Sequence, residues 1–516
     1  MMKKPSLIAF YLPQFHATPE NDRWWGKGFT EWTAARGAKS LFEGHKQPIV
    51  PLGKRYYNLL EKETMQWQAD LAKKYGIDGF SFYHYWFKDG RQVLEKPAEN
   101  LLRWKEIDMP FCFNWANESW ARTWSAVNNA SPWADQYETD EQENSSGMLL
   151  EQKYGRESAW KQHIQYLLPF FQDSRYIRHD GHPVFMMYHP DEVYCLSDMI
   201  AYWNDYLRAH GEKELYWIAG VHDVAVPFSG IANDFDAYYM TTAPIWRYLD
   251  ATTRDGVRCY DTKDYWEVFF QRHAPATIDG KHMYSTLLNG YDDTPRRGRA
   301  GFLVEKLSPE EFRGVLRKTL CMAAGQEHPF LFYNAWNEWG EGMFLEPDEE
   351  GGFAYLEVIR EVMQEECGAE GESSPAVDID PRLTAVSREA VRYGEEARIL
   401  NRWMELRDAG KTVGAMLEAM GVHHIAIYGF GDLGIRLKQE LKGAPVRVDY
   451  IIDRSAAARA DDCPTYPLQP DLPPVDLIVV TVHGLYSEVR RDIKRHVDYP
   501  VCSLAHILSE IDTEEN

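Results

Sequence analysis

The sequence predicts an α/β protein in which a (β/α)₈ TIM barrel is followed by a small Rossmann-like parallel α/β domain. At 516 residues the chain exceeds the size at which one hydrophobic core stops growing, so one large and one small domain are expected. Short apolar, β-rich stretches alternate with helical patterns through roughly the first 360 residues. A glycine-rich loop between a strand and a helix then begins a second α/β series near the C-terminus.

The stretches that we interpret as barrel strands are continuous apolar runs without strict alternation. This pattern is typical of parallel strands that are buried on both faces. Eight runs separated by helical patterns are the number that closes a (β/α)₈ barrel. They cover residues 7–12, 79–85, 110–115, 183–188, 215–221, 235–239, 282–288 and 329–333.

Two of the intervening helices have clear end signals. Ser308 is placed as an N-cap, Pro309 takes the first helical position, and apolar residues then recur on one face. Another helix carries an apolar stripe and ends at Gly211. The segments between the strands therefore have the physical signals of the helices that a barrel requires.

The composition changes after the barrel. Residues 365–381 are small, acidic and proline-bearing, which is typical of a linker, and the following segment is helical in pattern. New strands are expected at residues 424–428, 446–452 and 477–482. We therefore expect a (β/α)₈ barrel over residues 1–364, a linker and helical segment over 365–420, and a Rossmann-like domain of the nucleotide-binding type over 421–516.

The second unit contains a G-x-G-x-x-G motif in its required position, between a strand and a helix. Its residues are Gly429, Gly431 and Gly434, and Asp453 stands where an acid is expected to meet a ribose hydroxyl. The unit is short and lacks the second half of a dinucleotide domain. Two interpretations stay open: binding of a nucleotide or nucleotide-sugar as cofactor or ligand, and a purely structural role.

Charge and cysteine usage limit the partners that the chain is expected to have. A formal net charge of −23 opposes general affinity for nucleic acid or anionic lipid, which bind basic surfaces. The seven cysteines occur singly, without a C-x-x-C pair, so neither a disulfide framework nor a metal site is expected. No apolar stretch is long enough to span a membrane. We expect a soluble, cytoplasmic protein; the oligomeric state is left open.

Polar residues cluster where the predicted barrel strands end. The active sites of (β/α)₈ enzymes lie at the carboxyl ends of the strands. Taken singly, each such residue is more often a structural hydrogen-bonding group, so their shared position is the evidence. They are Gln14 and His16 after strand one, His84 in strand two, Asn117 and Glu118 after strand three, Tyr188 and His189 at strand four, Tyr238 in strand six, Asp292 and Asp293 after strand seven, and Glu338 after strand eight.

The segment after strand eight, residues 334–342, is the most informative for chemistry. It places Glu338 and Glu341 three residues apart among tryptophans and glycines. Breaking a glycosidic bond typically needs one carboxyl as acid and another as base or nucleophile, and sugar faces stack on indole rings. The alternative is that both glutamates solvate a loop or cap a helix. Trp32, Trp120 and Trp339 are candidate stacking residues, with core packing as the alternative.

Several motifs, in order, resemble the WbsX-like family, which is associated with surface-polysaccharide biosynthesis and is itself similar to glycoside hydrolase family 99, the endo-α-mannosidases. The resemblance covers roughly residues 6 to 362 and implies a (β/α)₈ barrel. The motifs are residues 10–16, 28–32, 76–80, 82–87, 114–118, 293–296 and 337–342.

The resemblance also implies roles for the two glutamates. Glu338 corresponds to the general base that acts on the sugar's own 2-hydroxyl, and Glu341 to the general acid and later base, which implies retention of configuration. Gly340 departs from family 99, where histidine usually precedes the second glutamate, so mannose specificity is not implied. The C-terminal domain is similar to those appended to sugar acyltransferases.

From these observations we expect an enzyme that cleaves or transfers a glycosidic bond of an oligosaccharide or polysaccharide, in O-antigen or capsule metabolism, without a cofactor in the barrel. The rival hypothesis is a non-catalytic glycan or nucleotide-sugar binding protein. Hydrolysis and transfer both remain open. The expected substrate-binding residues are His16, Trp32, Tyr83, His84, Asn117, Glu118, Trp120, Tyr188, Tyr238, Asp292, Asn337 and Trp339.

Overall fold

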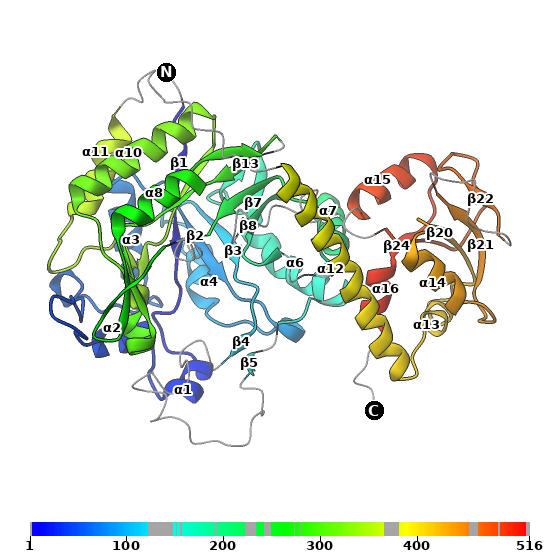
Figure 1. The fold of residues 1–516 in the computed structure, drawn as a ribbon, viewed down its shortest axis with the longest axis horizontal. Coiled ribbons are helices and arrows are strands. Elements are labelled where there is room, and N and C mark those ends of the chain that lie inside the picture. The colour runs from blue at the N-terminus through cyan, green and yellow to red at the C-terminus, as the bar shows by residue number, and fades with distance from the viewer. Residues whose placement is uncertain are drawn as a thin grey trace.

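A computed structural model describes the fold of the chain as mixed α/β (Figure 1). Its larger part is a curled, barrel-like sheet of mainly parallel strands with helices around it, and its C-terminal part has a second, smaller sheet. The structure describes residues 3–121, 148–150, 152–154, 157–190, 193, 195–221, 234–241, 249–272, 274–278, 280–365, 381–453, 463–482 and 486–511.

All eight predicted barrel stretches form strands of one sheet. Neighbouring strands pair in parallel in chain order, and β17 pairs back onto β1. The seventh stretch is split: β13 pairs with β9, and β14 pairs with β17. One short segment therefore connects both ends of the curled sheet. The strands are β1 (Ser6–Tyr11), β2 (Gly79–His84), β3 (Phe111–Trp115), β7 (His182–Met187), β8 (Tyr216–Val221), β9 (Ala237–Met240), β13 (Lys281–Tyr284), β14 (Thr286–Leu287) and β17 (Phe330–Tyr333).

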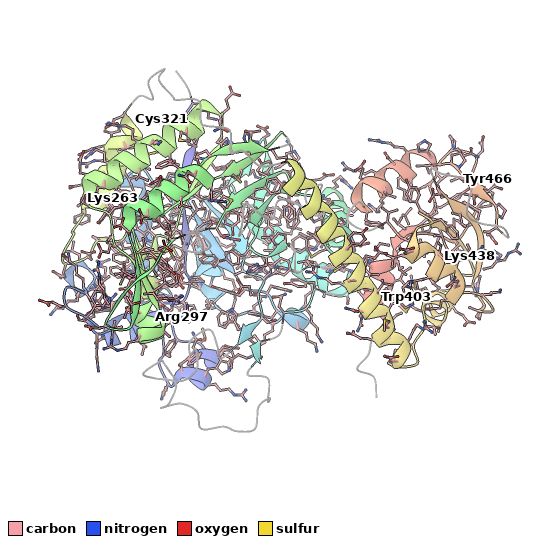
Figure 2. All side chains as sticks on the ribbon, viewed as in Figure 1. Lys263, Arg297, Cys321, Trp403, Lys438 and Tyr466 are labelled. Atoms are coloured by element: carbon pink, nitrogen blue, oxygen red, sulfur yellow. The ribbon has the colours of Figure 1, made fainter. Side chains whose placement is uncertain are left out.

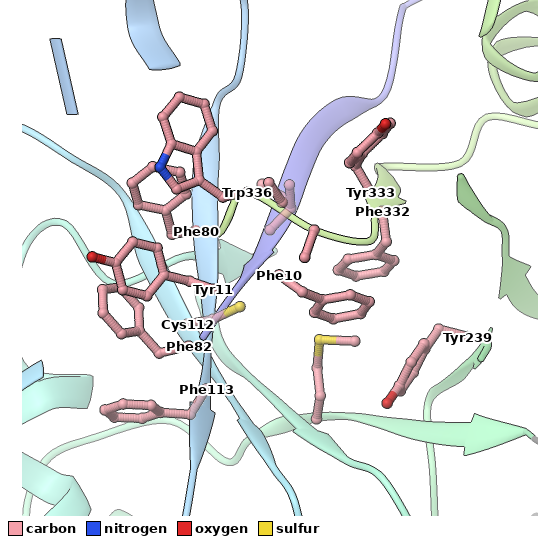
Figure 3. Close-up of a cluster of buried hydrophobic side chains, with 14 of the residues drawn as sticks. Phe10, Tyr11, Phe80, Phe82, Cys112, Phe113, Tyr239, Phe332, Tyr333 and Trp336 are labelled. Atoms are coloured by element: carbon pink, nitrogen blue, oxygen red, sulfur yellow. The ribbon is translucent and has the colours of Figure 1, made fainter. Parts of the chain in front are cut away.

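Aromatic side chains fill both faces of this sheet (Figure 3). Phe10 stacks on Phe332 with ring centroids 5.6 Å apart and contacts Tyr239 at the same distance. The next residue along β1, Tyr11, instead packs on Phe82 with centroids 4.3 Å apart. Successive residues of a strand point to opposite faces, so a shift of one position decides whether a side chain points into the barrel-like sheet or toward the helices.

The surrounding helices have the predicted signals where these were specific. In α10, the Ser308 hydroxyl accepts a hydrogen bond from the amide of Glu311, which confirms the predicted N-cap, and the Glu311 carboxylate accepts one from the amide of Ser308, which completes a capping box. The main helices are α3 (Lys62–Lys74), α4 (Lys96–Arg103), α6 (Glu157–Phe171), α7 (Leu196–Ala209), α8 (Thr262–Arg272), α10 (Pro309–Gly325) and α11 (Ala354–Gln364).

Shorter elements extend the sheet or lie around one end of it. A small sheet has the order β10-β11-β16-β15, β4 pairs with β5, and β6 and β12 extend the large sheet beside β7 and β13. Their bounds are α1 (Pro19–Trp25), α2 (Glu31–Gly37), α9 (Thr294–Arg297), β4 (Trp120–Ala121), β5 (Met148–Leu150), β6 (Arg178–His179), β10 (Thr252–Arg254), β11 (Val257–Tyr260), β12 (Ala276–Ile278), β15 (Tyr291–Asp292) and β16 (Phe302–Val304), with 3₁₀ turns η1 (Leu52–Lys54), η2 (Lys88–Gly90) and η7 (Gly298–Ala300).

The C-terminal sheet is entirely parallel, with the order β22-β21-β20-β23-β24. Three strands lie where they were predicted, whereas the short β22 and β24 were not predicted. Residues 366–380 of the predicted linker lie outside the described residues. The elements are α12 (Pro381–Asp408), α13 (Val413–Ala419), β20 (His424–Tyr428), α14 (Asp432–Glu440), β21 (Arg447–Ile452), β22 (Thr465–Tyr466), β23 (Leu477–Val480), α15 (Tyr486–His496), β24 (Val501–Ser503) and α16 (Leu504–Glu510).

The two sheets are joined through helices (Figure 1). The Ser503 hydroxyl donates a 2.7 Å hydrogen bond to Asp198 of α7, and His506 of α16 meets Trp160 of α6 edge-on with ring centroids 4.9 Å apart. Arg490 of α15 pairs with Asp205 of α7. The C-terminal helices therefore pack on the helices that flank β7.

Candidate active site

The two predicted catalytic glutamates lie in a hairpin that follows β17. Its strands are β18 (Asn337–Glu338) and β19 (Met343–Phe344), joined by a 3₁₀ turn, η8 (Trp339–Glu341). Gly342 ends the turn in the left-handed region at φ 65°, and a Cβ atom there would lie 3.0 Å from the amide nitrogen of Asp292. A glycine is needed there for both reasons.

Asn337 fastens this hairpin to the end of β1. Its side-chain oxygen accepts a 2.8 Å hydrogen bond from the amide of Leu12, and its side-chain nitrogen donates a 3.0 Å bond to the carbonyl of the same residue. Asn337 is buried. The structure therefore supports a positional role for Asn337 in place of the predicted contact with substrate.

Arg296 of α9 brings three carboxylates together. Its Nη1 donates to Glu341, its Nη2 lies 3.3 Å from Oε1 of Glu338, and its Nε lies 2.7 Å from Oε1 of Glu31. The exposed fractions of the side chains are 23% for Glu341, 9% for Glu338 and 4% for Glu31. The structure thus brings Glu338 and Glu341 onto one guanidinium, with Glu341 the more accessible.

The two glutamates differ in their affinity for a proton. Burial raises the pKa of Glu341 to about 8, the charge of Glu338 adds to the rise, and Arg296 opposes it. Burial also raises the pKa of Glu338, and Arg296 opposes this rise as well. Glu341 is therefore the carboxyl that holds a proton at neutral pH, which is the state required of a general acid.

Tyrosines surround the glutamate pair. Burial raises the pKa of Tyr83 on β2, and the charge of Glu338 raises it further. For Tyr188, burial is again the first cause, followed by the charges of neighbouring groups that include Glu118 and Glu341. Glu118 forms a 2.8 Å ion pair with His189. Tyr83, Glu118 and Tyr188 therefore remain candidates for contacts with substrate.

His84 and Tyr238 do not join this group. His84 is buried, and its Nε2 lies 2.7 Å from Nε2 of His163 in α6. Burial lowers the pKa of His84 to about 3. Strand alternation explains both cases, because the adjacent residues Tyr83 and Tyr239 are the ones that point into the barrel-like sheet.

Asn117 uses its polar groups within the protein. Its side chain accepts a 2.7 Å hydrogen bond from the amide of His189 and donates to the carbonyl of His189 at 2.7 Å and to the hydroxyl of Tyr154 at 3.1 Å. Asn117 thus connects the loops that follow β3 and β7. The predicted contact with a sugar is not supported.

Asp292 is engaged in the same way. Its carboxylate accepts hydrogen bonds from the side chains of Gln47 at 2.7 Å and Thr294 at 2.6 Å, and it pairs with His45 at 3.0 Å. Asp292 is buried. It stabilises the start of α9, where Arg296 lies, and it leaves no oxygen for a substrate.

Three tryptophans that were predicted to stack on sugar are packed against protein rings. Trp339 is buried, stacks on Phe344 with centroids 3.9 Å apart, and donates a 2.8 Å hydrogen bond to Glu346. Trp32 contacts Trp339 with centroids 5.4 Å apart. Trp120 lies edge-on to Tyr85 at 5.1 Å. For these three, the alternative of core packing is the one that the structure supports.

His16 remains near the end of β1 but makes no described contact with the glutamate pair. It is buried, and among the described residues its Nδ1 has no hydrogen-bond partner. Burial lowers its pKa. Its role as a contact to substrate stays a prediction.

Sequence reasoning missed the two charged residues closest to the pair, Glu31 and Arg296. Both were quoted within motifs, at residues 28–32 and 293–296, but neither was assigned a function. The available signal was an ionisable residue inside an otherwise apolar or turn-forming motif. The next residue in α9, Arg297, is marked in Figure 2. Arg297 pairs with Asp293 at 3.1 Å.

The glycine motif of the C-terminal sheet forms a tight loop between β20 and α14. Gly429 has φ 87°, Gly431 is the N-cap residue of α14, and a Cβ atom on Gly434 would lie 2.3 Å from the carbonyl oxygen of Gly429. Asp453 accepts a 2.8 Å hydrogen bond from the amide of Phe430 in this loop. The ligand of this loop stays a prediction.

Three further sequence expectations meet structural findings. Cys321, marked in Figure 2, is disulfide-bonded, a bond that was not predicted from the sequence, whereas the other five cysteines that the structure describes are not disulfide-bonded. Within the described ranges, no group of three or more His, Cys, Asp or Glu side chains is placed to hold a metal ion. The helices in the described part of the chain include none with the length and apolarity needed to cross a membrane.

The site thus places two carboxyl side chains after the last strand of a curled, mainly parallel sheet. Residues 7–359 match the family described as Glycosyltransferase WbsX, and the chain belongs to this family. The membership that was predicted from the motifs is confirmed.

Two relatives from Xanthomonas campestris pv. campestris are both named "Uncharacterized protein WxcX". The protein from strain B100 is 32% identical over 371 residues, which cover 69% of this chain and 49% of the relative. The protein from strain ATCC 33913 is 32% identical over 369 residues with the same coverage. The chain thus spans about half the length of the curated relatives that it matches.

Solved structures with similarity to the chain include a "Glycoside hydrolase-like protein". It has a TM-score of 0.45 and 14% identity and covers 70% of this chain and 95% of its own. A second is the GH99 endo-alpha-mannosidase from Bacteroides thetaiotaomicron, with a TM-score of 0.38, 14% identity, and coverage of 69% and 96%.

Proposed function

We propose that the chain is a carbohydrate-active enzyme that cleaves or transfers a glycosidic bond with retention, in surface-polysaccharide metabolism. Glu338 is the general base and Glu341 the general acid and then the base. The observation that carries this proposal is that one guanidinium contacts both carboxyls and that burial raises the pKa of Glu341 to about 8, so this carboxyl can hold a proton at neutral pH. Retaining enzymes need two such carboxyls close together, in different protonation states.

The proposed chemistry has two steps. In the first, Glu341 gives its proton to the glycosidic oxygen, and Glu338 takes the proton of the sugar's 2-hydroxyl, whose oxygen attacks the anomeric carbon as the glycosidic bond breaks. In the second, Glu341 accepts the proton of water or of an acceptor hydroxyl, and the oxygen of that molecule attacks the anomeric carbon and opens the anhydro ring. Glu338 then returns its proton to the 2-oxygen. Both glutamates end as they began.

We also infer the finer architecture that was predicted. The closed order of eight strands supports a (β/α)₈ barrel over residues 1–364. The parallel order β22-β21-β20-β23-β24 supports a Rossmann-like domain over residues 421–516. Residues 365–420 would then connect the two domains, largely through α12 and α13.

The proposal is tested with Glu338→Gln and Glu341→Gln in the full chain. Turnover is measured on a panel of neutral oligosaccharides, aryl glycosides and glycosyl fluorides, because the natural sugar is unidentified. Glu357→Gln, at an exposed position of α11, is the matched control and keeps wild-type turnover. We expect both site variants to lose activity. Wild-type turnover in both would refute the assignment.

Product analysis separates the two forms of the reaction. A labelled acceptor sugar is supplied with the donor, and the products are identified by mass and by the configuration of the new anomeric carbon. Free sugar identifies a hydrolase, and an elongated acceptor identifies a transferase. Glycan binding without turnover would support the rival hypothesis of a binding protein.

A further inference from the structure

We propose that Arg296, oriented by Glu31, is a positioning residue that holds the two glutamates on one guanidinium and balances the negative charge of the pair, and that Gly340 is the residue that makes room for it. This inference rests on the proposed function. It concerns an arginine that contacts both glutamates, the carboxylate that binds this arginine, and a glycine that lies between the two glutamates in the chain.

The orientation of Arg296 is determined by Glu31. A guanidinium presents its N–H groups in one rigid plane. Because Nε is bound by Glu31 at 2.7 Å, both Nη atoms face the hairpin, one toward Glu338 and the other toward Glu341. Glu31 is the first residue of α2 and is almost fully buried, so its carboxylate is a fixed anchor.

Gly340 provides the space for this anchor. A Cβ atom on Gly340 would lie 1.8 Å from Oε1 of Glu31 and 2.8 Å from Nε of Arg296. The backbone at Gly340 does not require positive φ, so its conformation is open to other residues. Space is therefore the reason for a glycine between the two glutamates.

The charges explain what the arrangement does. Three carboxylates surround one guanidinium, and burial makes the excess negative charge costly. One bound proton relieves this excess. Glu31 raises the pKa of both glutamates and Arg296 lowers both, so the two residues act on the pair with opposite sign.

A purely structural arginine in this chain looks different. Arg175 pairs with the carboxylate of Asp173 and donates to the carbonyls of Leu101, Trp104 and Ile107. A single carboxylate and three neutral acceptors neutralise it without excess negative charge. Arg175 therefore serves as the matched control for the loss of a buried arginine.

The test is a titration of the glutamate carboxyls in the full chain, without substrate, by carbon-13 NMR of protein labelled at the glutamate carboxyl carbon. Glu338→Gln and Glu341→Gln assign the two signals. Arg296→Met is expected to move both titrations to higher pH by roughly one unit, and Glu31→Gln to move both to lower pH. Unmoved titrations, or shifts of the same sign in both variants, would overturn the inference.

Controls separate this effect from loss of structure. Arg175→Met is expected to lower thermal stability and leave both titrations unchanged. Gly340→Ala is expected to lower stability, because the new Cβ atom meets the carboxylate of Glu31. The double variant Gly340→Ala/Glu31→Ala removes this clash and is expected to regain stability. Its glutamate carboxyls are not expected to titrate as they do in the wild type. If Arg175→Met moves the titrations as Arg296→Met does, the effect is structural and the inference fails.

Activity adds a second readout. The acidic and alkaline limbs of the kcat/KM profile are expected to shift with the carboxyl titrations. Arg296→Lys keeps the positive charge but loses the planar set of guanidinium donors, so it is expected to restore the position of the two limbs more fully than it restores kcat. Limbs that stay in place while the carboxyls shift would overturn the assigned role. The titration needs no turnover, so failure of the proposed function, seen as wild-type activity in Glu338→Gln and Glu341→Gln, is distinguishable from failure of this inference.

Discussion

The hairpin after β17 and the residues that directly follow it hold two glutamates in contrasting surroundings: half-buried Glu341, on the side that we call the front, and buried Glu346, on the side that we call the back. Glu346 accepts hydrogen bonds from Tyr57 at 2.8 Å, Gln68 at 2.7 Å and Trp339 at 2.8 Å, and it is 3% exposed. Glu341 instead meets a cation and other carboxylates and reaches solvent. Burial raises the pKa of both glutamates. Glu346 is surrounded by neutral hydrogen-bond donors and Glu341 by charged side chains, which is the difference that we expect between a supporting carboxyl and a catalytic one.

The largest expected effect lies at the front. Glu341→Gln and Glu338→Gln are each expected to lower kcat by about 10²- to 10⁴-fold, since proton transfer in the transition state is lost. Stability should be unchanged or higher in Glu338→Gln, because it removes a carboxylate from a buried group with excess negative charge. Glu341→Gln replaces a protonated carboxyl by a neutral amide and should change stability little at neutral pH. Steady-state kinetics and urea unfolding check the two halves of this prediction. A stability loss as large as the one expected below for Glu346→Leu would contradict the difference between the two glutamates.

At the back, the expected effect is on stability. Glu346→Leu leaves the buried donors of Tyr57, Gln68 and Trp339 without their acceptor, which is expected to cost about 2 to 4 kcal/mol in the free energy of unfolding. Glu346→Gln keeps an acceptor and should cost less. Urea unfolding at constant pH measures both, and equal losses would contradict the hydrogen-bond explanation.

The pH dependence of stability is expected to reflect both Glu341 and Glu346. Burial raises the folded-state pKa of Glu346 to about 7 and that of Glu341 to about 8, above the unfolded value of about 4.3. Their contribution is therefore fully present below about pH 4 and is lost as pH rises through 7 and 8. We expect the free energy of unfolding to fall between about pH 4 and pH 8, and less steeply in Glu346→Gln. A rise over this range would contradict the assignment.

The smallest effect is expected in the C-terminal glycine loop. Two of its glycines differ in the space around them, so they can be compared as the two glutamates are. Gly434→Ala places a Cβ atom 2.3 Å from a backbone oxygen and is expected to cost about 1 to 3 kcal/mol. Gly431→Ala meets no atom within 4 Å and should change stability by less than about 0.5 kcal/mol. Thermal unfolding of both variants measures the difference.

The sequence was sufficient for the strands but not for all of the site. Buried parallel strands are long apolar runs, so all eight were recognisable. In β2 and β9, adjacent polar residues compete for the inward position, and an apolar run does not tell Tyr83 from His84 or Tyr238 from Tyr239. One position in the strand register decides each case.

Long-range contacts account for the other differences. Arg296 meets Glu31 across 265 residues of chain, and no local pattern predicts such a pairing. Asn337 and Trp339 were correctly placed beside the glutamates, yet their polar atoms bind Leu12 and Glu346. A motif identifies the segment, whereas the fold decides which of its side chains face inward.

The contact between Ser503 and Asp198 has a practical consequence for anyone who shortens this chain. A fragment that stops before α12 would uncover the ring of Trp160 and leave Asp198, a buried carboxyl, facing water without its serine partner. Both lie on helices next to β3 and β7, the strands that precede Asn117 and Tyr188 in the chain. Expression of the part with the larger sheet alone would therefore test a molecule with an altered flank, and all 516 residues are the proper sample for binding and kinetics.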